Sequence, residues 1–324
     1  MQRLLSGIQP TGELHIGNYL GAIRNWVLLQ GSYETFYCIV DLHAMTLPYD
    51  PNDMSQRTLE LAKTLLACGI DPELSVFFVQ SHVKEHTELA WILMCLATMG
   101  ELSRMTQFKE KSSEQKELAT AGLFTYPVLQ AADILLYKAE VVPVGEDQVQ
   151  HLEFTRDVCR RFNSRFGEFF EEPKPLLSRT PRIMGLDGLT KMSKSRNNHI
   201  PLLASPDQIW SLLKGAYTDP ARLRRHDPGH PEICNIFTIH HGFSAQELVA
   251  SIESDCKTAK IGCMDCKKML AQNMAQNLEP IRERYSSLKN AQVLEILGAG
   301  AKKAQVVARE TMVEVRQKLG LLSL

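Results

Sequence analysis

The feature that most constrains the fold is an alternation, in the first half of the chain, of short apolar runs with stretches of helical periodicity. The apolar runs have the length of buried strands, and the stretches between them repeat hydrophobic residues three and four positions apart. The expected strands are 4–8, 36–40, 76–79 and 141–144, and the expected helices are 18–29, 53–68, 85–99, 126–137 and 147–162. Strands that alternate with helices form βαβ units and a parallel sheet. We therefore expect an α/β domain with a Rossmann-like parallel sheet.

The second half of the chain has a different pattern. Strand signals nearly vanish, and the segments 207–213, 245–252, 267–285 and 301–319 carry helical spacing. We expect a mostly helical C-terminal domain that follows the α/β domain. The expected divisions are an α/β domain over 1–184 with a short helical insertion at about 85–135, a mobile loop over 185–198, a helical domain over 199–290, and a C-terminal helix over 291–324 that returns to the main body.

Charge and hydropathy exclude some classes of protein. The net charge of the 324 residues is −1, whereas a dedicated DNA binder is usually strongly basic, so we expect no DNA partner. A local basic surface for RNA remains compatible with this balance. The N-terminus lacks the pattern of a signal peptide, and no apolar run approaches the ~18 residues of a membrane span. We therefore expect a cytoplasmic protein without membrane contact.

The first chemical motif is Gly12-Glu13-Leu14-His15-Ile16-Gly17-Asn18, between an expected strand and an expected helix. A helix that starts there would present backbone N–H groups and a positive dipole end to an anion. Gly12 and Gly17 allow a tight turn, and His15 can donate a hydrogen bond to a phosphate. The motif alone is also compatible with a simple glycine turn that carries a surface histidine.

The second chemical motif is Lys191-Met192-Ser193-Lys194-Ser195, within the expected loop. Two lysines three positions apart, with small polar residues around them, suit a flexible clamp on a polyphosphate. For a lysine pair in isolation, a solvated basic loop is the favoured interpretation.

The two motifs in this order resemble the paired signature of class I aminoacyl-tRNA synthetases. The segments 6–12, 105–111, 126–137 and 142–148 are similar to those of the bacterial tryptophanyl-tRNA synthetases, and the resemblance covers nearly the whole chain. It implies activation of tryptophan with ATP and Mg²⁺, then transfer to tRNA(Trp). It further implies a homodimer formed through the insertion at 85–135, and anticodon binding by the domain at 199–290.

The resemblance also implies roles for individual residues. Asp133 would accept the indole N–H, since indole offers only a donor. The residues expected to bind tryptophan are Asp133, Tyr126, His43, Gln130, Val142, Val144 and Gln148. Those expected to bind ATP are Gln9, Pro10, Thr11, Gly17, Asn18, Gly145, Glu146, Asp147, Ile183, Lys191, Met192, Ser193, Lys194 and Ser195, and those expected to act in catalysis are His15, Lys191 and Lys194. Lys109 and Lys111 are further candidate phosphate ligands. Gln130 departs from many relatives, which have Met there.

A cluster of cysteines lies in the helical half: Cys234, Cys256, Cys263 and Cys266. Four thiolates suit tetrahedral zinc or an iron–sulfur cluster, and spacing alone does not separate the two. The chemistry of the residues favours zinc, whereas the resemblance implies a 4Fe–4S cluster, which a subgroup of the bacterial enzymes carries. Four unligated thiols are the third alternative. The other cysteines, Cys38, Cys68, Cys95 and Cys159, are expected to be small buried hydrophobes.

Three other functions compete with tryptophan–tRNA ligase. The nearest is a tyrosine–tRNA ligase. A small-molecule nucleotidylyltransferase would share the first motif but not the second motif or the helical tail. An iron–sulfur RNA-binding protein with a vestigial active site would come from a different class.

Overall fold

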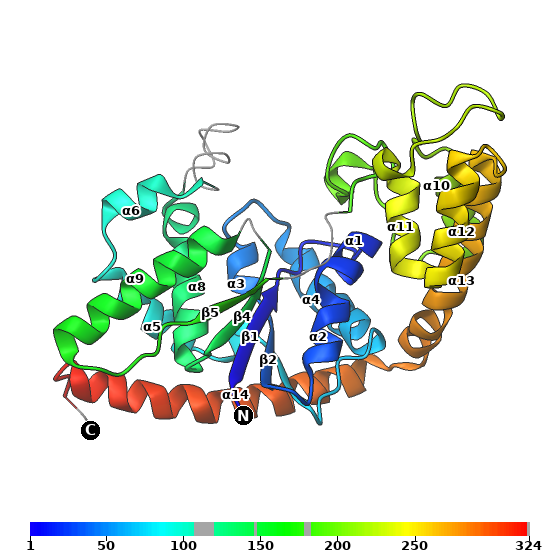
Figure 1. Cartoon of the computed structure of the whole chain (residues 1–324). Helices are drawn as coiled ribbons and strands as arrows, with labels where there is room; N and C mark the ends of the chain where they lie inside the picture. Colours follow the sequence, from blue (N-terminus) through cyan, green and yellow to red (C-terminus); the bar gives the residue numbers. More distant parts are fainter. Residues whose placement is uncertain (107–119, 146–147, 178–182, 323–324) are drawn as a thin grey trace.

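The computed structural model describes residues 1–106, 120–145, 148–177 and 183–322. Within these ranges, five parallel strands form one sheet in the order β3-β2-β1-β4-β5 (Figure 1). The strands are β1 Arg3–Ile8, β2 Glu34–Ile39, β3 Ser75–Val79, β4 Val141–Val144 and β5 Lys174–Leu177. The sheet confirms the expected Rossmann-like α/β fold.

Successive residues of the central strands are buried on opposite faces of the sheet. Leu4 and Tyr37 belong to one hydrophobic core, and Leu5 and Phe36 belong to the other. Both faces of a parallel sheet are covered, so each strand needs apolar residues at nearly every position. This is why the strands were recognisable as continuous apolar runs.

Helices cover both cores. The helical elements of the α/β part are α1 Ile16–Asn18, η1 Tyr19–Ile23, α2 Arg24–Leu29, α3 Asp41–Ala44, α4 Pro51–Ala67, η2 Gln80–His82, α5 Glu85–Met94, α6 Met99–Arg104, α8 Ala121–Leu136 and α9 Val149–Phe166. The helix expected over 18–29 is three consecutive helical stretches, the middle one a π-helix.

Two expectations about the α/β part were wrong. The helix expected over 85–99 ends at Met94, and a new helix begins at Met99 because Thr98 and Glu101 form a capping box there. Strand β5 was not expected, because Pro175 lies in it. It pairs only with β4 at the sheet edge, where proline is tolerated.

The helical part follows the loop that contains the second motif. The loop itself contains η5 Lys194–Arg196, and the elements of the helical part are α10 Pro206–Lys214, η6 Pro231–Ile233, α11 Asn235–Phe243, α12 Gln246–Lys257 and α13 Cys263–Ser287. Helix α11 was not expected from the sequence. The helical C-terminal region is otherwise as expected. No helix among the described residues combines the length and apolar character that crossing a bilayer requires.

The last helix, α14 Asn290–Lys318, leaves the helical part and runs beneath the sheet (Figure 1). It lies so close to β3 that a Cβ at Gly300 would collide with the carbonyl of Phe77. Near its C-terminal end Arg316 forms two hydrogen bonds of 2.7 Å with Glu88 of α5. The final helix therefore returns to the α/β part, as the sequence led us to expect.

Candidate functional site

A pocket of about 270 Å³ opens at the carboxyl ends of β1 and β4. The strand order reverses between these two strands, and ligands of open α/β sheets bind at such a switch point. All seven residues expected to bind tryptophan line this pocket: His43, Tyr126, Gln130, Asp133, Val142, Val144 and Gln148. Gln9, from the set expected to bind ATP, lines it too.

The pocket is built around the buried carboxylate of Asp133, which helix α8 supplies. Its Oδ1 accepts a hydrogen bond of 2.7 Å from Gln80 Nε2 and lies 2.6 Å from His86 Nδ1, while its Oδ2 lies 2.7 Å from His43 Nε2. Burial raises the pKa of Asp133, but the neighbouring His43 and His86 outweigh burial and hold the pKa at about 2. Asp133 is therefore a charged acceptor at neutral pH.

Tyr126 forms an aromatic wall of the same pocket. Its hydroxyl lies 2.6 Å from His151 Nε2, and its ring meets the His43 ring edge to face at a centroid distance of 6.3 Å. Burial raises the pKa of Tyr126 above its usual value, so the phenol keeps its proton. Val142 and Val144 add apolar surface from β4. A flat ligand with one polar edge suits this combination.

The lining includes residues that the sequence did not single out for binding, among them Ser6, Gly7, Val40 and Ile134. Ser6 and Gly7 lie near the carboxyl end of β1, and Val40 directly follows β2. Their position at the carboxyl ends of neighbouring parallel strands was the signal that could have found them. Gln80 and His86 contact Asp133 without lining the pocket, and no motif in their local sequence predicted this role.

The first motif connects β1 to the helical run that starts at Ile16. Asn18 Oδ1 accepts a 3.1 Å hydrogen bond from the backbone N–H of His15, which closes the turn. Burial, together with the charges of His199 and Lys191, lowers the pKa of His15 to about 4. His15 is therefore neutral at pH 7 and can donate one N–H. A Cβ at Gly17 would lie 2.9 Å from His15 Nδ1, so a side chain there would displace the His15 ring.

The second motif lies against the first. Met192 is buried in the core that also contains Ile183, and its backbone N–H donates to the Ile183 carbonyl over 3.2 Å. Lys191, Lys194 and Ser195 are exposed, and the Lys194 ammonium reaches Gly12 of the first motif. The tertiary structure thus brings the lysine-bearing second motif against the glycine turn of the first motif, which is far away in the chain.

Asn198 holds this loop in place. Its Oδ1 accepts from the backbone N–H of Ser193 over 2.8 Å, and its Nδ2 donates to Asp187 Oδ2 over 2.8 Å. The Asn198 amide, with further donors from Leu189 and Thr190, holds the pKa of Asp187 at about 2. The loop is therefore tied down at its base, while the lysine side chains project into solvent. Whether it moves stays a prediction.

The remaining residues expected to bind ATP fall into two groups. Pro10 and Thr11 lie in the turn after β1, and Gly145 is exposed directly after β4, near the same edge of the sheet. Glu146 and Asp147 lie outside the described residues, as do Lys109 and Lys111.

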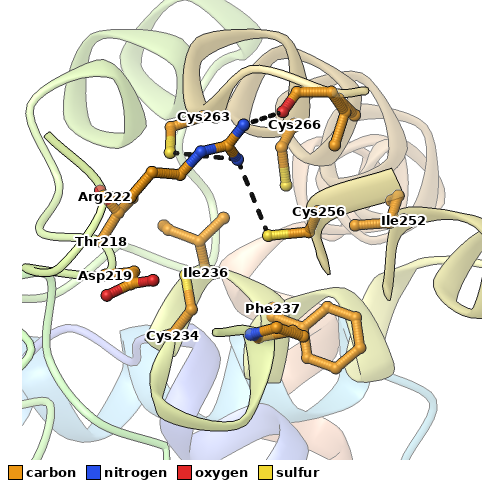
Figure 2. A pocket seen from close by; sticks show the side chains of 12 residues that line it. Thr218, Asp219, Arg222, Cys234, Ile236, Phe237, Ile252, Cys256, Cys263 and Cys266 are labelled. Carbon is orange, nitrogen blue, oxygen red and sulfur yellow. Dashed lines mark hydrogen bonds between the residues drawn. The ribbon is translucent and has the colours of Figure 1, made fainter. Parts of the chain in front are cut away.

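The four clustered cysteines line a second, smaller pocket between the helices of the C-terminal part (Figure 2). Arg222 enters it: its Nη1 lies 3.8 Å from Cys256 Sγ and 3.9 Å from Cys263 Sγ. Within the described ranges, no group of three or more His, Cys, Asp or Glu is arranged to hold a metal ion. Of the other cysteines, Cys95 is exposed, contrary to expectation.

Comparisons with known proteins agree with this geometry. A family model described as tRNA synthetases class I (W and Y) matches residues 1–279. The tryptophan–tRNA ligase of Deinococcus radiodurans is 50% identical over 331 residues, which cover 100% of both chains. That of Thermotoga maritima is 48% identical and covers 99% of each chain. A solved tryptophanyl-tRNA synthetase from Campylobacter jejuni, complexed with ADP and tryptophan, has a TM-score of 0.89 at 38% identity, covering 99% of this chain and 100% of that one.

These matches decide between the alternatives left open by the sequence. The full-length relatives are tryptophan enzymes, which argues against a tyrosine–tRNA ligase. The helical tail and the second motif exclude a small-molecule nucleotidylyltransferase, which would lack both. The two motifs contact each other through Gly12 and Lys194, and this intact arrangement argues against an RNA-binding protein with a vestigial active site. The chain therefore belongs to the bacterial tryptophan–tRNA ligases, a family of class I aminoacyl-tRNA synthetases.

Proposed function

We propose that the pocket at the switch point binds tryptophan and that the two motifs beside it bind ATP. The chain activates tryptophan to tryptophanyl-adenylate and then transfers it to tRNA(Trp). The observation that carries the assignment of the residues is the buried, charged Asp133, which lines a pocket walled by Tyr126, Val142 and Val144 at the carboxyl ends of β1 and β4.

In the first step the carboxylate of tryptophan attacks the α-phosphorus of ATP, and pyrophosphate leaves. The substrate supplies the nucleophile, so the protein contributes position and charge stabilisation. Lys191 and Lys194 are exposed cations on the loop beside Gly12 and would bind the phosphates of the Mg²⁺–ATP complex. Neutral His15 would donate a hydrogen bond to a phosphate without adding a charge.

In the second step a ribose hydroxyl at the 3′ end of the tRNA attacks the carbonyl carbon of the adenylate, and AMP leaves. Selectivity is set before this step, because a site built around a buried acceptor rejects an amino acid that leaves the acceptor unpaired. Asp133 would accept the indole N–H. Phenylalanine has no group to offer it, and tyrosine places its hydroxyl elsewhere.

We also infer that two copies of the chain associate through the region around residues 85–135. Two large apolar side chains are exposed there: Trp91 on α5 is 68% exposed and Met99 on α6 is 70% exposed. Large exposed apolar groups on neighbouring helices are characteristic of protein interfaces.

For the cysteine pocket we propose a 4Fe–4S cluster held by Cys234, Cys256, Cys263 and Cys266. All four cysteines line one pocket. Two cationic side chains lie near them: the Arg222 guanidinium contacts the sulfurs of Cys256 and Cys263, and the buried Lys267 directly follows Cys266 in the chain. Four cysteine thiolates that line one pocket are the ligand set that such a cluster requires. When bound, such a cluster would cross-link the segments that carry the cysteines.

The proposed function is tested by amino-acid-dependent exchange of labelled pyrophosphate into ATP. Purified protein with Mg²⁺–ATP is incubated with tryptophan, tyrosine or phenylalanine. We expect label in ATP with tryptophan alone. Exchange driven by tyrosine, or by none of the three, would overturn the assignment of the pocket.

A further inference from the structure

We infer that His86 is a positioning residue for the selection of tryptophan, and that Tyr137 sets its tautomer. This inference rests on the proposed role of Asp133. The two residues come from different elements, His86 from α5 and Tyr137 from the position directly after α8. Both side chains are 0% exposed, and neither lines the tryptophan pocket. They therefore act on the substrate through Asp133.

The geometry is a chain of two short hydrogen bonds. His86 Nδ1 lies 2.6 Å from Asp133 Oδ1, and His86 Nε2 lies 2.8 Å from the Tyr137 hydroxyl. Burial raises the pKa of Tyr137 above its usual value, so the phenol keeps its proton and can donate it to Nε2. When Nε2 accepts the phenol proton, Nδ1 is the nitrogen that carries a hydrogen, and it donates that hydrogen to the carboxylate. The opposite tautomer would direct a lone pair at a negative charge.

The two oxygens of Asp133 have different surroundings. Oδ1 accepts from Gln80 Nε2 as well as facing His86, so both of its partners lie behind the pocket. Among the described residues, Oδ2 has one partner, His43, which itself lines the pocket. A carboxylate oxygen accepts two hydrogen bonds, so Oδ2 keeps capacity for a donor from the pocket. Asp133 is thus anchored through one oxygen and presents the other to the ligand.

The anchor is rigid because aromatic rings enclose it. The Tyr137 ring stacks on Phe36 at a centroid distance of 4.7 Å, and the His86 ring lies 6.0 Å from Phe78. A carboxylate whose supporting groups cannot change rotamer discriminates between ligands better than a mobile one. On this basis His86 contributes to the choice of amino acid rather than to ATP chemistry.

The test compares tryptophan with β-(3-benzothienyl)alanine, in which sulfur replaces the indole N–H and the shape is kept. The readout is the ratio of kcat/KM for the two amino acids in pyrophosphate exchange. His86→Leu removes the donor to Asp133. We expect the preference for tryptophan to fall by about tenfold or more, mostly because kcat/KM for tryptophan decreases. His86→Asn can place an amide N–H near the former Nδ1, and we expect it to keep most of the preference.

The matched control is Leu89→Ala, which removes a buried side chain from the same helix that offers no hydrogen-bond donor to Asp133. We expect Leu89→Ala to lower kcat/KM for tryptophan and for the analogue by the same factor. An equal loss in His86→Leu would overturn the inference and show a purely structural role. If the unsubstituted protein showed no tryptophan-dependent exchange, the proposed function would be overturned instead. Failure of this inference and failure of the proposed function are therefore distinguishable.

Tyr137→Phe provides an independent test, because it removes a single oxygen atom and does not depend on His86→Leu being folded. The histidine then no longer has a fixed tautomer. We expect the preference for tryptophan to fall by about threefold, with little change for the analogue. An unchanged ratio would overturn the role of Tyr137.

Discussion

The ammonium of Lys194 lies against Gly12, in space that a side chain at position 12 would occupy. A Cβ at Gly12 would stand 3.0 Å from Lys194 Nζ, and the φ of +132° at Gly12 is one that other residues rarely adopt. The contact joins the turn after the first strand to the loop beyond the sheet. It places a cation beside the turn where we propose that the ATP phosphates bind.

Replacement of that cation tests the catalytic proposal. We expect Lys194→Ala to lower the single-turnover rate of adenylate formation by about 10²-fold, the scale of one stabilising contact in a transition state. The binding of tryptophan should change little, because Lys194 does not line its pocket. Lys302→Ala, which removes an exposed lysine from α14, is the control. A wild-type rate in Lys194→Ala would remove this residue from the mechanism.

Loss of the buried carboxylate should affect one substrate far more than the other. In Asp133→Ala we expect kcat/KM for tryptophan to fall by at least about 100-fold, because both the indole N–H and the donors around Asp133 lose their acceptor. The KM for ATP should change little. Steady-state exchange with each substrate varied in turn measures both. Comparable losses for ATP and tryptophan would argue for general damage instead of a role in specificity.

The lowered pKa of His15 predicts a stability that depends on pH. The pKa is about 4 in the folded chain and 6.5 ordinarily, so between these values the unfolded state binds more protons. The stability that His15 contributes is therefore present above about pH 6.5 and is lost as the pH falls toward 4. We expect the Tm to decrease less on acidification from pH 7 to 4.5 in His15→Gln than in the unsubstituted protein. Parallel curves would contradict the assignment.

Metal analysis tests the proposed cluster. Protein purified without oxygen should contain about four iron and four sulfide per chain and absorb visible light. Cys263→Ser should lower the iron content, whereas Cys95→Ser, which replaces an exposed cysteine outside the pocket, should not. Zinc at one equivalent with no visible absorption would favour the alternative ligand, and the absence of both metals would leave four free thiols.

The proposed dimer is testable with one charged substitution. Trp91→Glu would place a carboxylate in the desolvated centre of the interface, which costs free energy unless the charge is paired. We expect sedimentation to show monomers, or a strongly weakened dimer. Leu28→Glu is the matched control, since Leu28 is equally exposed but lies on α2. A dimer that survives Trp91→Glu would place the contact elsewhere.

The sequence by itself determined the type of fold and predicted the chemistry of the two motifs. Strands such as Glu34–Ile39 are buried on both faces and are therefore recognisable as apolar runs, and local glycines and lysines mark the segments that we propose to bind the phosphates. It did not reveal β5, because the proline that argued against a strand is tolerated at a sheet edge that only the assembled sheet defines.

Only the tertiary structure decided which side chains surround Asp133. Three separate parts of the chain supply Gln80, His86 and Tyr137. These residues meet only because the helices pack on the face of the sheet that carries Leu5 and Phe36, so no local spacing connects them. A lone histidine in an amphipathic helix looks like any other helical residue until its partners are known. Motifs are read from neighbours in sequence, whereas the support of a buried charge depends on neighbours in space.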